Sequence, residues 1–333
     1  MSSLYPLLLK PEFYARPWGA RDLAPIYDRH VEPGEQPIGE AWLTGDECVV
    51  ANGEFTGRKL GELCKEFGKR LVGSLPANEG RFPLLIKFLF PREKLSVQVH
   101  PDDEGAKRLK QPCGKTECWY VLDAERNATV ALGLKPGTTK AAFEQAIREN
   151  RAEELMNWIP VHRGELIYVD AGTVHAIGPG SVLVETQQNS DTTFRLYDYG
   201  RPRELHVEQG MQALKEKTNA GKVWRTSNDG YDRLVASPCF VVDRMALSRE
   251  QTFAGTPESA QCIVATQGAA VIEAGNASPV LLTCGECVVI PASVGEYRVK
   301  PQWNIEFLRS ALPAGEVGTP SIMHMADHFI TAR

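Results

Sequence analysis

Short runs of β-branched and aromatic residues, separated by glycine and proline, recur along most of this chain of 333 residues. Glycine occurs 29 times and proline 22 times, often between two such runs. The runs that we predict as strands are 118–122, 128–132, 166–169, 182–185, 240–246, 262–266, 270–273, 280–282, 288–290 and 305–309. Because many short strands are typical of sandwiches and barrels, the fold is predicted to be mainly β.

Helical periodicity is confined to three stretches of the chain. Residues 57–72 carry a one-sided apolar stripe, 139–158 begin at Thr139 as a candidate N-cap, and 204–215 form a third amphipathic segment. These helices do not alternate regularly with the predicted strands. A doubly wound parallel sheet is therefore disfavoured, and the helices are expected to be inserted into the β-structure or to flank it.

An internal repeat relates two distant parts of the chain. Residues 164–175 align without gaps to residues 285–296, and both copies read Gly-Glu, an apolar run, a turn and a further short segment. Such a repeat predicts two related β-domains in tandem, at 1–215 and 230–333, joined by a polar connector. The first copy ends in His175 and the second in Glu296, so only the first domain is expected to hold a metal.

The densest chemistry lies between residues 94 and 103. Gln98 and His100 are two positions apart, so on a strand both side chains point to the same side. Leu95, Val97 and Val99 would then face the opposite way, into packing. A polar pair that points into a domain is costly unless something satisfies it, and a divalent metal would do so.

Two further residues can complete such a metal site. Glu117 opens the strand predicted at 118–122, and His175 ends the first repeat copy. Two imidazoles, a carboxylate and the amide oxygen of Gln98 suit Zn²⁺, with Mn²⁺, Fe²⁺, Co²⁺ or Ni²⁺ as alternatives. A site that keeps one position open fits a catalytic metal better than a structural one. The alternative is that each histidine is an ordinary core or surface residue.

Several motifs resemble those of a known family. The glycine-bounded segment 164–175 resembles the second cupin motif, although Asp170 stands where proline is usual, and Gln98 replaces the usual first histidine of the first motif. The string Gln-Val-His-Pro-Asp at 98–102 resembles the type I mannose-6-phosphate isomerases, together with Ile-Gly-Glu-Ala-Trp at 38–42, Thr-Thr-Phe-Arg-Leu at 192–196 and Trp18-Gly19. The resemblance runs from about residue 5 to residue 312, in the compact bacterial form of the family.

The resemblance implies two tandem cupin (jelly-roll) β-barrel domains, the first catalytic and the second degenerate. It implies one Zn²⁺ per chain, held by Gln98, His100, Glu117 and His175. It places catalytic positions at Lys115, Glu185, Asp191 and Arg195, and substrate-phosphate positions at Lys87, Ser96 and Arg201. The family has lysine at the last of these positions, so arginine here keeps the charge but changes its geometry.

The reaction implied by the resemblance interconverts D-mannose 6-phosphate and D-fructose 6-phosphate through an ene-diol(ate). Alternatives are a cupin isomerase of another phosphosugar, a metal-dependent cupin dioxygenase and a non-catalytic sugar-binding bicupin. Individual residues also have simpler explanations. Lys115 could be a solvated loop cation, Glu185 could pair with Arg195, and Asp191 and Arg201 could be turn residues.

Composition limits the partners and the compartment. A net charge of −5 without a basic stripe makes nucleic acid a poor candidate partner. No stretch of about 18 apolar residues predicts a membrane span, and the N-terminus does not read as a signal peptide. The pair Cys284 and Cys287 lacks the second cysteine pair that a zinc site would need. All eight cysteines are expected to be reduced. We therefore expect a cytoplasmic protein, and the resemblance implies an enzyme for a small phosphosugar. A monomer or weak homo-oligomer is expected.

Overall fold

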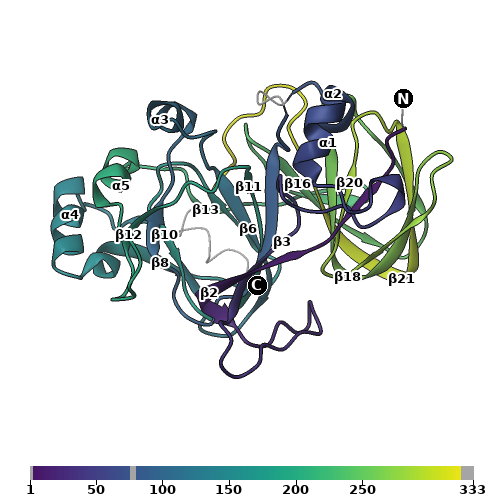
Figure 1. Cartoon of the computed structure of the whole chain (residues 1–333). Coiled ribbons are helices and arrows are strands. Elements are labelled where there is room, and N and C mark those ends of the chain that lie inside the picture. Colours follow the sequence, from purple (N-terminus) through teal and green to yellow (C-terminus); the bar gives the residue numbers. More distant parts are fainter. Residues whose placement is uncertain (1–2, 76–79, 324–333) are drawn as a thin grey trace. The chain divides into compact units, whose positions relative to one another are not determined.

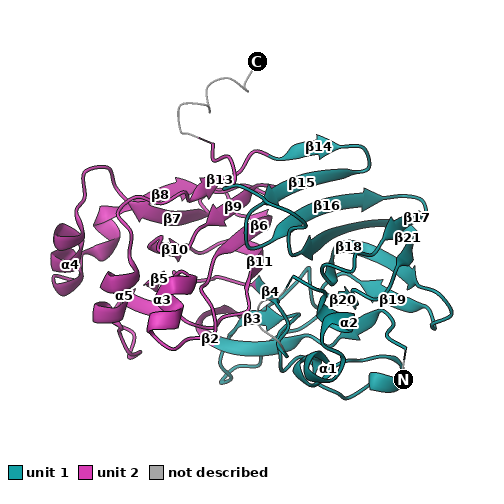
Figure 2. Cartoon of the chain, turned by 90° about the horizontal axis from the view of Figure 1, so that it is seen from above, with its two compact units in different colours: residues 1–15, 21–88, 225–319 teal, residues 16–20, 89–224, 320–333 magenta. Residues whose placement is uncertain are grey.

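The computed structural model describes residues 3–75 and 80–323, which divide into two compact units (Figure 1). Unit 1 comprises residues 1–15, 21–88 and 225–319, and unit 2 comprises residues 16–20, 89–224 and 320–333, as far as they are described (Figure 2). The predicted mainly β architecture is confirmed. Closure of the sheets into barrels stays a prediction.

Unit 2 is built from antiparallel strands. Its five-stranded sheet has the order β12 (Phe194–Tyr197), β5 (Val97–Val99), β10 (His175–Ile177), β7 (Thr129–Leu134) and β8 (Met156–Pro160). Its other strands pair in the order β13 (Gly221–Lys222), β9 (Leu166–Val169), β6 (Glu117–Ala124) and β11 (Ser181–Gln188).

Apolar packing decides which way β5 faces. The helical segments of unit 2 are α3 (Asp103–Arg108), α4 (Lys140–Arg148), the 3₁₀ helix η2 (Ala152–Leu155) and α5 (Val207–Ala213). Val97 and Val99 are buried in a cluster with Phe143 and Ile147 of α4, on the helical side of unit 2 (Figure 2). Because side chains alternate along a strand, Gln98 lies on the opposite face. The predicted orientation is confirmed for Val97 and Val99, but it is wrong for Leu95, which precedes the strand and packs in a different cluster with Trp119 and Val121.

Unit 1 contains a nine-stranded sheet and a smaller set of strands and helices. The sheet consists of β1 (Leu7–Leu9), β20 (Cys287–Ile290), β18 (Gln261–Glu273), β21 (Glu296–Ala311), β16 (Val241–Leu247), β15 (Tyr231–Ala236) and β14 (Thr226–Asn228), with β17 (Gln251–Ala254) on β21 and β19 (Val280–Thr283) on β18. The remaining elements are β2 (Glu12–Ala20), which continues into unit 2 at Arg16, β3 (Ile38–Trp42), β4 (Leu84–Leu89), η1 (Gly53–Phe55), α1 (Leu60–Phe67) and α2 (Lys69–Val72).

The observed units group the chain differently from the predicted domains. Residues 21–88, expected in the first domain, belong to the same unit as residues 225–319. Backbone hydrogen bonds give the reason, because the Ala292 amide donates to the Leu71 carbonyl at 2.9 Å and the Ala260 amide donates to the Val72 carbonyl at 3.1 Å. Residues 324–333, the end of the predicted second domain, lie outside the described residues.

The predicted helices are confirmed at 57–72, as α1 and α2, and at 204–215, as α5. In the segment 139–158, Thr139 caps α4, since its Oγ1 accepts from the Ala142 amide at 3.2 Å. The rest of that prediction is wrong, because α4 ends at Arg148 and residues 156–160 form β8. Asn150 has a φ of 57°, in the left-handed region, which interrupts a right-handed α-helix. None of the helices in the described ranges 3–75 and 80–323 is long and apolar enough to cross a membrane.

Both repeat copies have the same local structure. In the first, β9 is followed by a turn and β10 begins at His175, whereas in the second, β20 is followed by a turn and β21 begins at Glu296. Each copy opens with a glycine at positive φ, 85° at Gly164 and 90° at Gly285. The repeat is thus a repeat of structure as well as of sequence.

Candidate metal centre

Strand register in the five-stranded sheet brings three predicted site residues onto one face. Gln98 of β5 lies opposite His175 of β10 on one side and opposite Arg195 of β12 on the other. Directly opposed residues of antiparallel strands point to the same face of a sheet. This face is the one opposite Val97 and Val99, so all three side chains point away from the helices.

The strands β6 and β11 present a second group of polar side chains. Glu117, the first residue of β6, lies opposite Gln187, and Trp119 lies opposite Glu185. Because alternate residues share a face, Glu117 and Glu185 lie on the same side of this strand pair. Both carboxylates are buried, as is Lys115, which precedes the strand.

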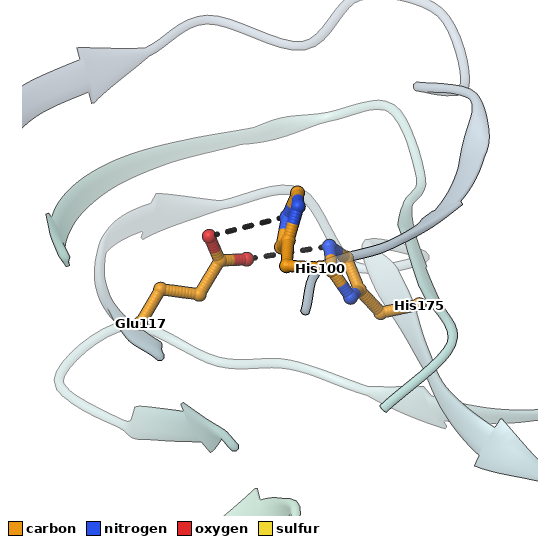
Figure 3. A group of neighbouring side chains, drawn as sticks. All are labelled: His100, Glu117 and His175. Carbon is orange, nitrogen blue, oxygen red and sulfur yellow. Dashed lines mark ion pairs between the residues drawn. The ribbon is translucent and has the colours of Figure 1, made fainter. Parts of the chain in front are cut away.

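His100, Glu117 and His175 come together in a buried cluster (Figure 3). The Glu117 carboxylate points at both imidazoles, with Oε2 at 3.5 Å from His100 Nε2 and Oε1 at 3.3 Å from His175 Nε2. The side chains of the three residues are 2%, 1% and 0% exposed, respectively. Their ligating atoms all lie within 4.8 Å of one another, a separation that one bound ion can span.

Backbone carbonyls fix the orientation of both imidazoles. His100 Nδ1 lies 2.9 Å from the Thr192 carbonyl oxygen, and His175 Nδ1 lies 2.9 Å from the Thr173 carbonyl oxygen. A carbonyl only accepts, so each Nδ1 carries the proton and each Nε2 presents its lone pair toward Glu117. Burial lowers the pKa of His175 to about 4, which keeps this imidazole in the neutral form that binds metals.

The donor set fits a divalent transition metal. Oε2 of Glu117 is buried and forms an ion pair with the Lys115 ammonium at 3.1 Å. A buried carboxylate requires such positive charge, and the Nε2 atoms of two imidazoles face the same carboxylate. Two imidazole nitrogens and a carboxylate oxygen suit Zn²⁺ and its neighbours in the first transition row.

Gln98 lies next to this cluster. Its Nε2 is 3.1 Å from His175 Nε2, and its Oε1 is 3.3 Å from Ser96 Oγ. Rotating the side-chain amide of Gln98 by half a turn exchanges the positions of its oxygen and its nitrogen. The Ser96 hydroxyl would then accept a hydrogen bond from the Gln98 nitrogen instead of donating one to the oxygen. The Gln98 oxygen would then face the cluster, which makes this residue suitable as a fourth ligand.

Lys115 is held among the acidic groups of the site. Its Nζ lies 3.2 Å from His100 Nε2, 3.1 Å from Glu117 Oε2 and 3.7 Å from Glu185 Oε1. Burial alone would lower the pKa of Lys115, but the Glu117 and Glu185 carboxylates outweigh it and raise that pKa. The simple explanation of Lys115 as a solvated loop cation is wrong, because its side chain is only 5% exposed.

Arg195 and Asp191 differ in burial. The Arg195 guanidinium donates from Nη1 to the Glu204 carbonyl at 2.8 Å, and its buried Nε finds no hydrogen-bond partner among residues 3–75 and 80–323. Burial and the neighbouring Arg203 and Arg201 lower the pKa of Arg195. Asp191 is exposed, in the loop between β11 and β12.

The three predicted phosphate residues have different local surroundings. Ser96 is buried beside Gln98, next to the metal cluster. Arg201 forms an ion pair with Asp198 at 2.8 Å and donates to the Lys94 carbonyl at 2.7 Å, so it is more than an exposed turn residue. Lys87 belongs to unit 1, where it is buried in β4 with its Nζ 5.6 Å from the Trp42 ring centroid.

The carbonyls of Thr173 and Thr192 were not predicted as part of the site. Any residue carries a carbonyl, so no side-chain pattern could have pointed to them. Only the course of the backbone after β9 and β11 places these oxygens against the imidazoles.

In unit 1, the position equivalent to Glu117 carries the neutral amide of Gln261. Val169 and Ile290 occupy the same position in the two repeat copies. Glu117 pairs with Val169 and Gln261 pairs with Ile290, so Gln261 is the counterpart of Glu117. Its Oε1 accepts from the Tyr297 hydroxyl at 2.7 Å and its Nε2 donates to the Ala254 carbonyl at 3.0 Å. The neutral Gln261 amide is thus already satisfied within the protein.

Replacing Glu296 by histidine is therefore expected to create no second metal site. Glu296 is exposed, and a single imidazole without a carboxylate partner cannot hold an ion firmly. Metal analysis of Glu296→His should give the same metal-to-protein ratio as the unaltered chain. A ratio raised by one equivalent would contradict this.

Comparison with known proteins finds similar sequences over much of this chain. The family model for the catalytic domain of type I phosphomannose isomerase matches residues 7–146. Mannose-6-phosphate isomerase ManA of Bacillus subtilis is 41% identical over 63% of this chain and 68% of its own length. The mannose-6-phosphate isomerase of Streptococcus mutans is 37% identical over 73% of this chain and 79% of its own.

A solved structure extends the similarity to nearly the whole chain. The crystal structure of mannose 6-phosphate isomerase from Bacillus subtilis superimposes with a TM-score of 0.81 at 29% identity, covering 92% of this chain and 99% of that one. The fold, the family model and the curated relatives therefore lead to one conclusion: this chain belongs to the type I phosphomannose isomerase family.

Proposed function

We propose that this protein interconverts D-mannose 6-phosphate and D-fructose 6-phosphate at a divalent metal held by His100, Glu117 and His175, with Gln98 as fourth ligand. The observation that carries the proposal is the buried cluster of two imidazoles and one carboxylate, with both Nδ1 atoms fixed on backbone carbonyls. It occurs in a chain whose relatives are mannose-6-phosphate isomerases.

We propose Zn²⁺ as the metal, one per chain, because the donor set is mixed nitrogen and oxygen without thiolate. A bound divalent metal supplies Lewis-acid stabilisation of negative charge on the sugar oxygens O1 and O2. The protein must then move a proton from C2 of the aldose to C1 of the ketose.

The side chains around the cluster divide into two roles. The cations Lys115 and Arg195 stabilise the charge that develops on the ene-diolate oxygens. The candidates for moving the proton are Glu185, Asp191 and Lys115. Burial favours Glu185, which shares a face with Glu117, over Asp191, which is exposed.

The test is an isomerisation assay with mannose 6-phosphate, with and without a chelator. Turnover is expected to disappear when the metal is removed and to return when Zn²⁺ is added back. The same assay with other aldose phosphates distinguishes an isomerase of another phosphosugar. Protein that holds stoichiometric zinc but turns over none of these sugars would leave the dioxygenase and the non-catalytic bicupin as alternatives.

Lys87 is proposed to bind the substrate phosphate together with Ser96 and Arg201. Since a charge-assisted hydrogen bond contributes about 1.5–3 kcal/mol, Lys87→Ala is expected to raise KM by roughly 10- to 100-fold with little change in kcat. Steady-state kinetics measure both constants. Lys10→Ala, at an exposed lysine of the same unit, serves as the control. An unchanged KM would remove Lys87 from the phosphate site.

A cytoplasmic location and a monomeric or weakly oligomeric state remain our proposals. The location rests on the expectation that the cysteines are reduced, and all eight cysteines are free thiols. Gel filtration with light scattering measures the oligomeric state directly.

A further inference from the structure

The turn between β9 and β10, residues 170–173, contacts every segment that contributes to the metal cluster. The Gly172 amide donates to the His100 carbonyl at 2.8 Å. The Ala171 amide donates to Thr116 Oγ1 at 3.3 Å, next to Glu117 in sequence. The Thr173 carbonyl accepts from His175 Nδ1 at 2.9 Å. The conformation of this turn therefore determines where the imidazole of His175 points.

The carboxylate of Asp170 stabilises this turn by hydrogen bonds. Its Oδ1 accepts from the Thr173 hydroxyl at 2.7 Å, and the Asn219 amide donates to Oδ1 and Oδ2 at 3.1 and 3.0 Å. Hydrogen bonds to an ionised acceptor are stronger than those between neutral groups. Thr173 is 1% exposed, so its hydroxyl has little access to water as a substitute partner.

The second repeat copy supplies an internal comparison. There the corresponding turn has the same backbone bond, from the Val294 amide to the Pro291 carbonyl at 2.9 Å, against 3.1 Å from the Thr173 amide to the Asp170 carbonyl. Pro291 and Val294 replace Asp170 and Thr173, so this copy has neither the carboxylate nor the hydroxyl. The pair of polar side chains thus occurs in the copy that ends in histidine and is missing from the copy that ends in Glu296.

We infer that Asp170 is a positioning residue for the metal centre, which fixes the Thr173 carbonyl so that His175 presents Nε2 to the ion. The metal-binding part of this inference rests on the function proposed above. Asp170 is not one of the clustered ligands, and it acts on His175 through its hydrogen bond with Thr173. In the second repeat copy, Pro291 fixes its own φ covalently. In the first copy, Asp170 fixes the corresponding turn by hydrogen bonds.

The first experiment measures metal affinity by competition with a chelator of known affinity. Loss of a group that orients a ligand typically costs 10- to 100-fold in metal affinity, so Asp170→Ala and Thr173→Val are each expected to weaken Zn²⁺ binding about 10-fold. Because both substitutions break the same contact, the double variant should be little worse than either single one. Asp170→Asn retains an acceptor for the Thr173 hydroxyl and should restore most of the affinity.

The second experiment reads the tautomer of His175 in the metal-free protein. With ¹⁵N-labelled histidine, long-range ¹H–¹⁵N spectra are expected to show His175 protonated at Nδ1 in the unaltered chain. In Asp170→Ala and Thr173→Val, a fraction protonated at Nε2 should appear. Thr44→Val is the matched control, because Thr44 is a buried threonine of unit 1 with hydrogen bonds to Leu84 and Ile86. This control is expected to change at most the melting temperature and to alter neither the tautomer nor the affinity.

The outcomes separate this inference from the proposed function. If the unaltered chain binds no metal, the proposed function fails, while the tautomer measurement still tests Asp170. If the unaltered chain binds metal and both Asp170→Ala and Thr173→Val keep its affinity and its tautomer, the inference about Asp170 is overturned. Should Asp170→Ala not fold, the near-isosteric Thr173→Val decides the question by the same two measurements.

Discussion

His100→Ala and His175→Ala are each expected to lose bound metal and isomerase activity together. Each substitution removes one of the two imidazole nitrogens that face Glu117, so the cluster loses one of its three clustered ligands. The Lewis-acid contribution of a metal amounts to several kcal/mol, so kcat/KM should fall by about 10³-fold or more. Metal analysis and kinetics on the same preparations measure the two losses.

His162→Ala is the control for these two variants. Its imidazole is 65% exposed and lies in the same unit, so its removal should change neither metal content nor kcat. A His175→Ala variant that keeps both stoichiometric zinc and activity would exclude this cluster as the catalytic centre.

Arg195→Ala is expected to lose kcat while zinc stays bound. Arg195 lies opposite Gln98 on the face of the sheet that carries His175, but it is not one of the clustered ligands. Removal of a group that stabilises charge in the transition state typically costs about 10²–10³-fold in kcat. Arg195→Lys should recover only part of this loss, because an ammonium keeps the charge but not the planar guanidinium geometry.

The measurement is kcat together with the zinc content of each variant. Arg163→Ala, at an exposed arginine of the same unit, controls for loss of positive charge. A near-normal kcat in Arg195→Ala would remove this residue from the mechanism, and a loss of zinc would assign it to the structure of the metal centre instead.

Local structure was predicted best where one physical pattern dominates. The strand predicted at 166–169 is β9 as observed, because four consecutive apolar residues between turn residues leave few alternatives. The spacing of Gln98 and His100 likewise predicted a polar face on β5. The helix predicted over 139–158 was too long, since the apolar residues near its end also fit a strand, and pairing with β7 decided for β8.

Within the site, the sequence identified chemical types but not their surroundings. Lys115 looked like a possible loop cation, and only the fold shows its ammonium buried between Glu117 and Glu185. Asp191 and Glu185 are both carboxylates in the sequence, yet Asp191 is exposed and Glu185 is buried. Burial of a charged group depends on which segments pack over it, which no local pattern records.

By itself, the sequence determined the strand-rich character of the chain, its structural repeat and the residue types that can bind a metal, because side-chain alternation and ligand chemistry are local properties. The tertiary structure alone decided that His175 and Arg195 flank Gln98, that residues 21–88 belong to the unit of residues 225–319, and that Thr173 and Thr192 orient the two imidazoles. These features depend on strand register and on long-range backbone hydrogen bonds, which form between segments that are far apart in the chain.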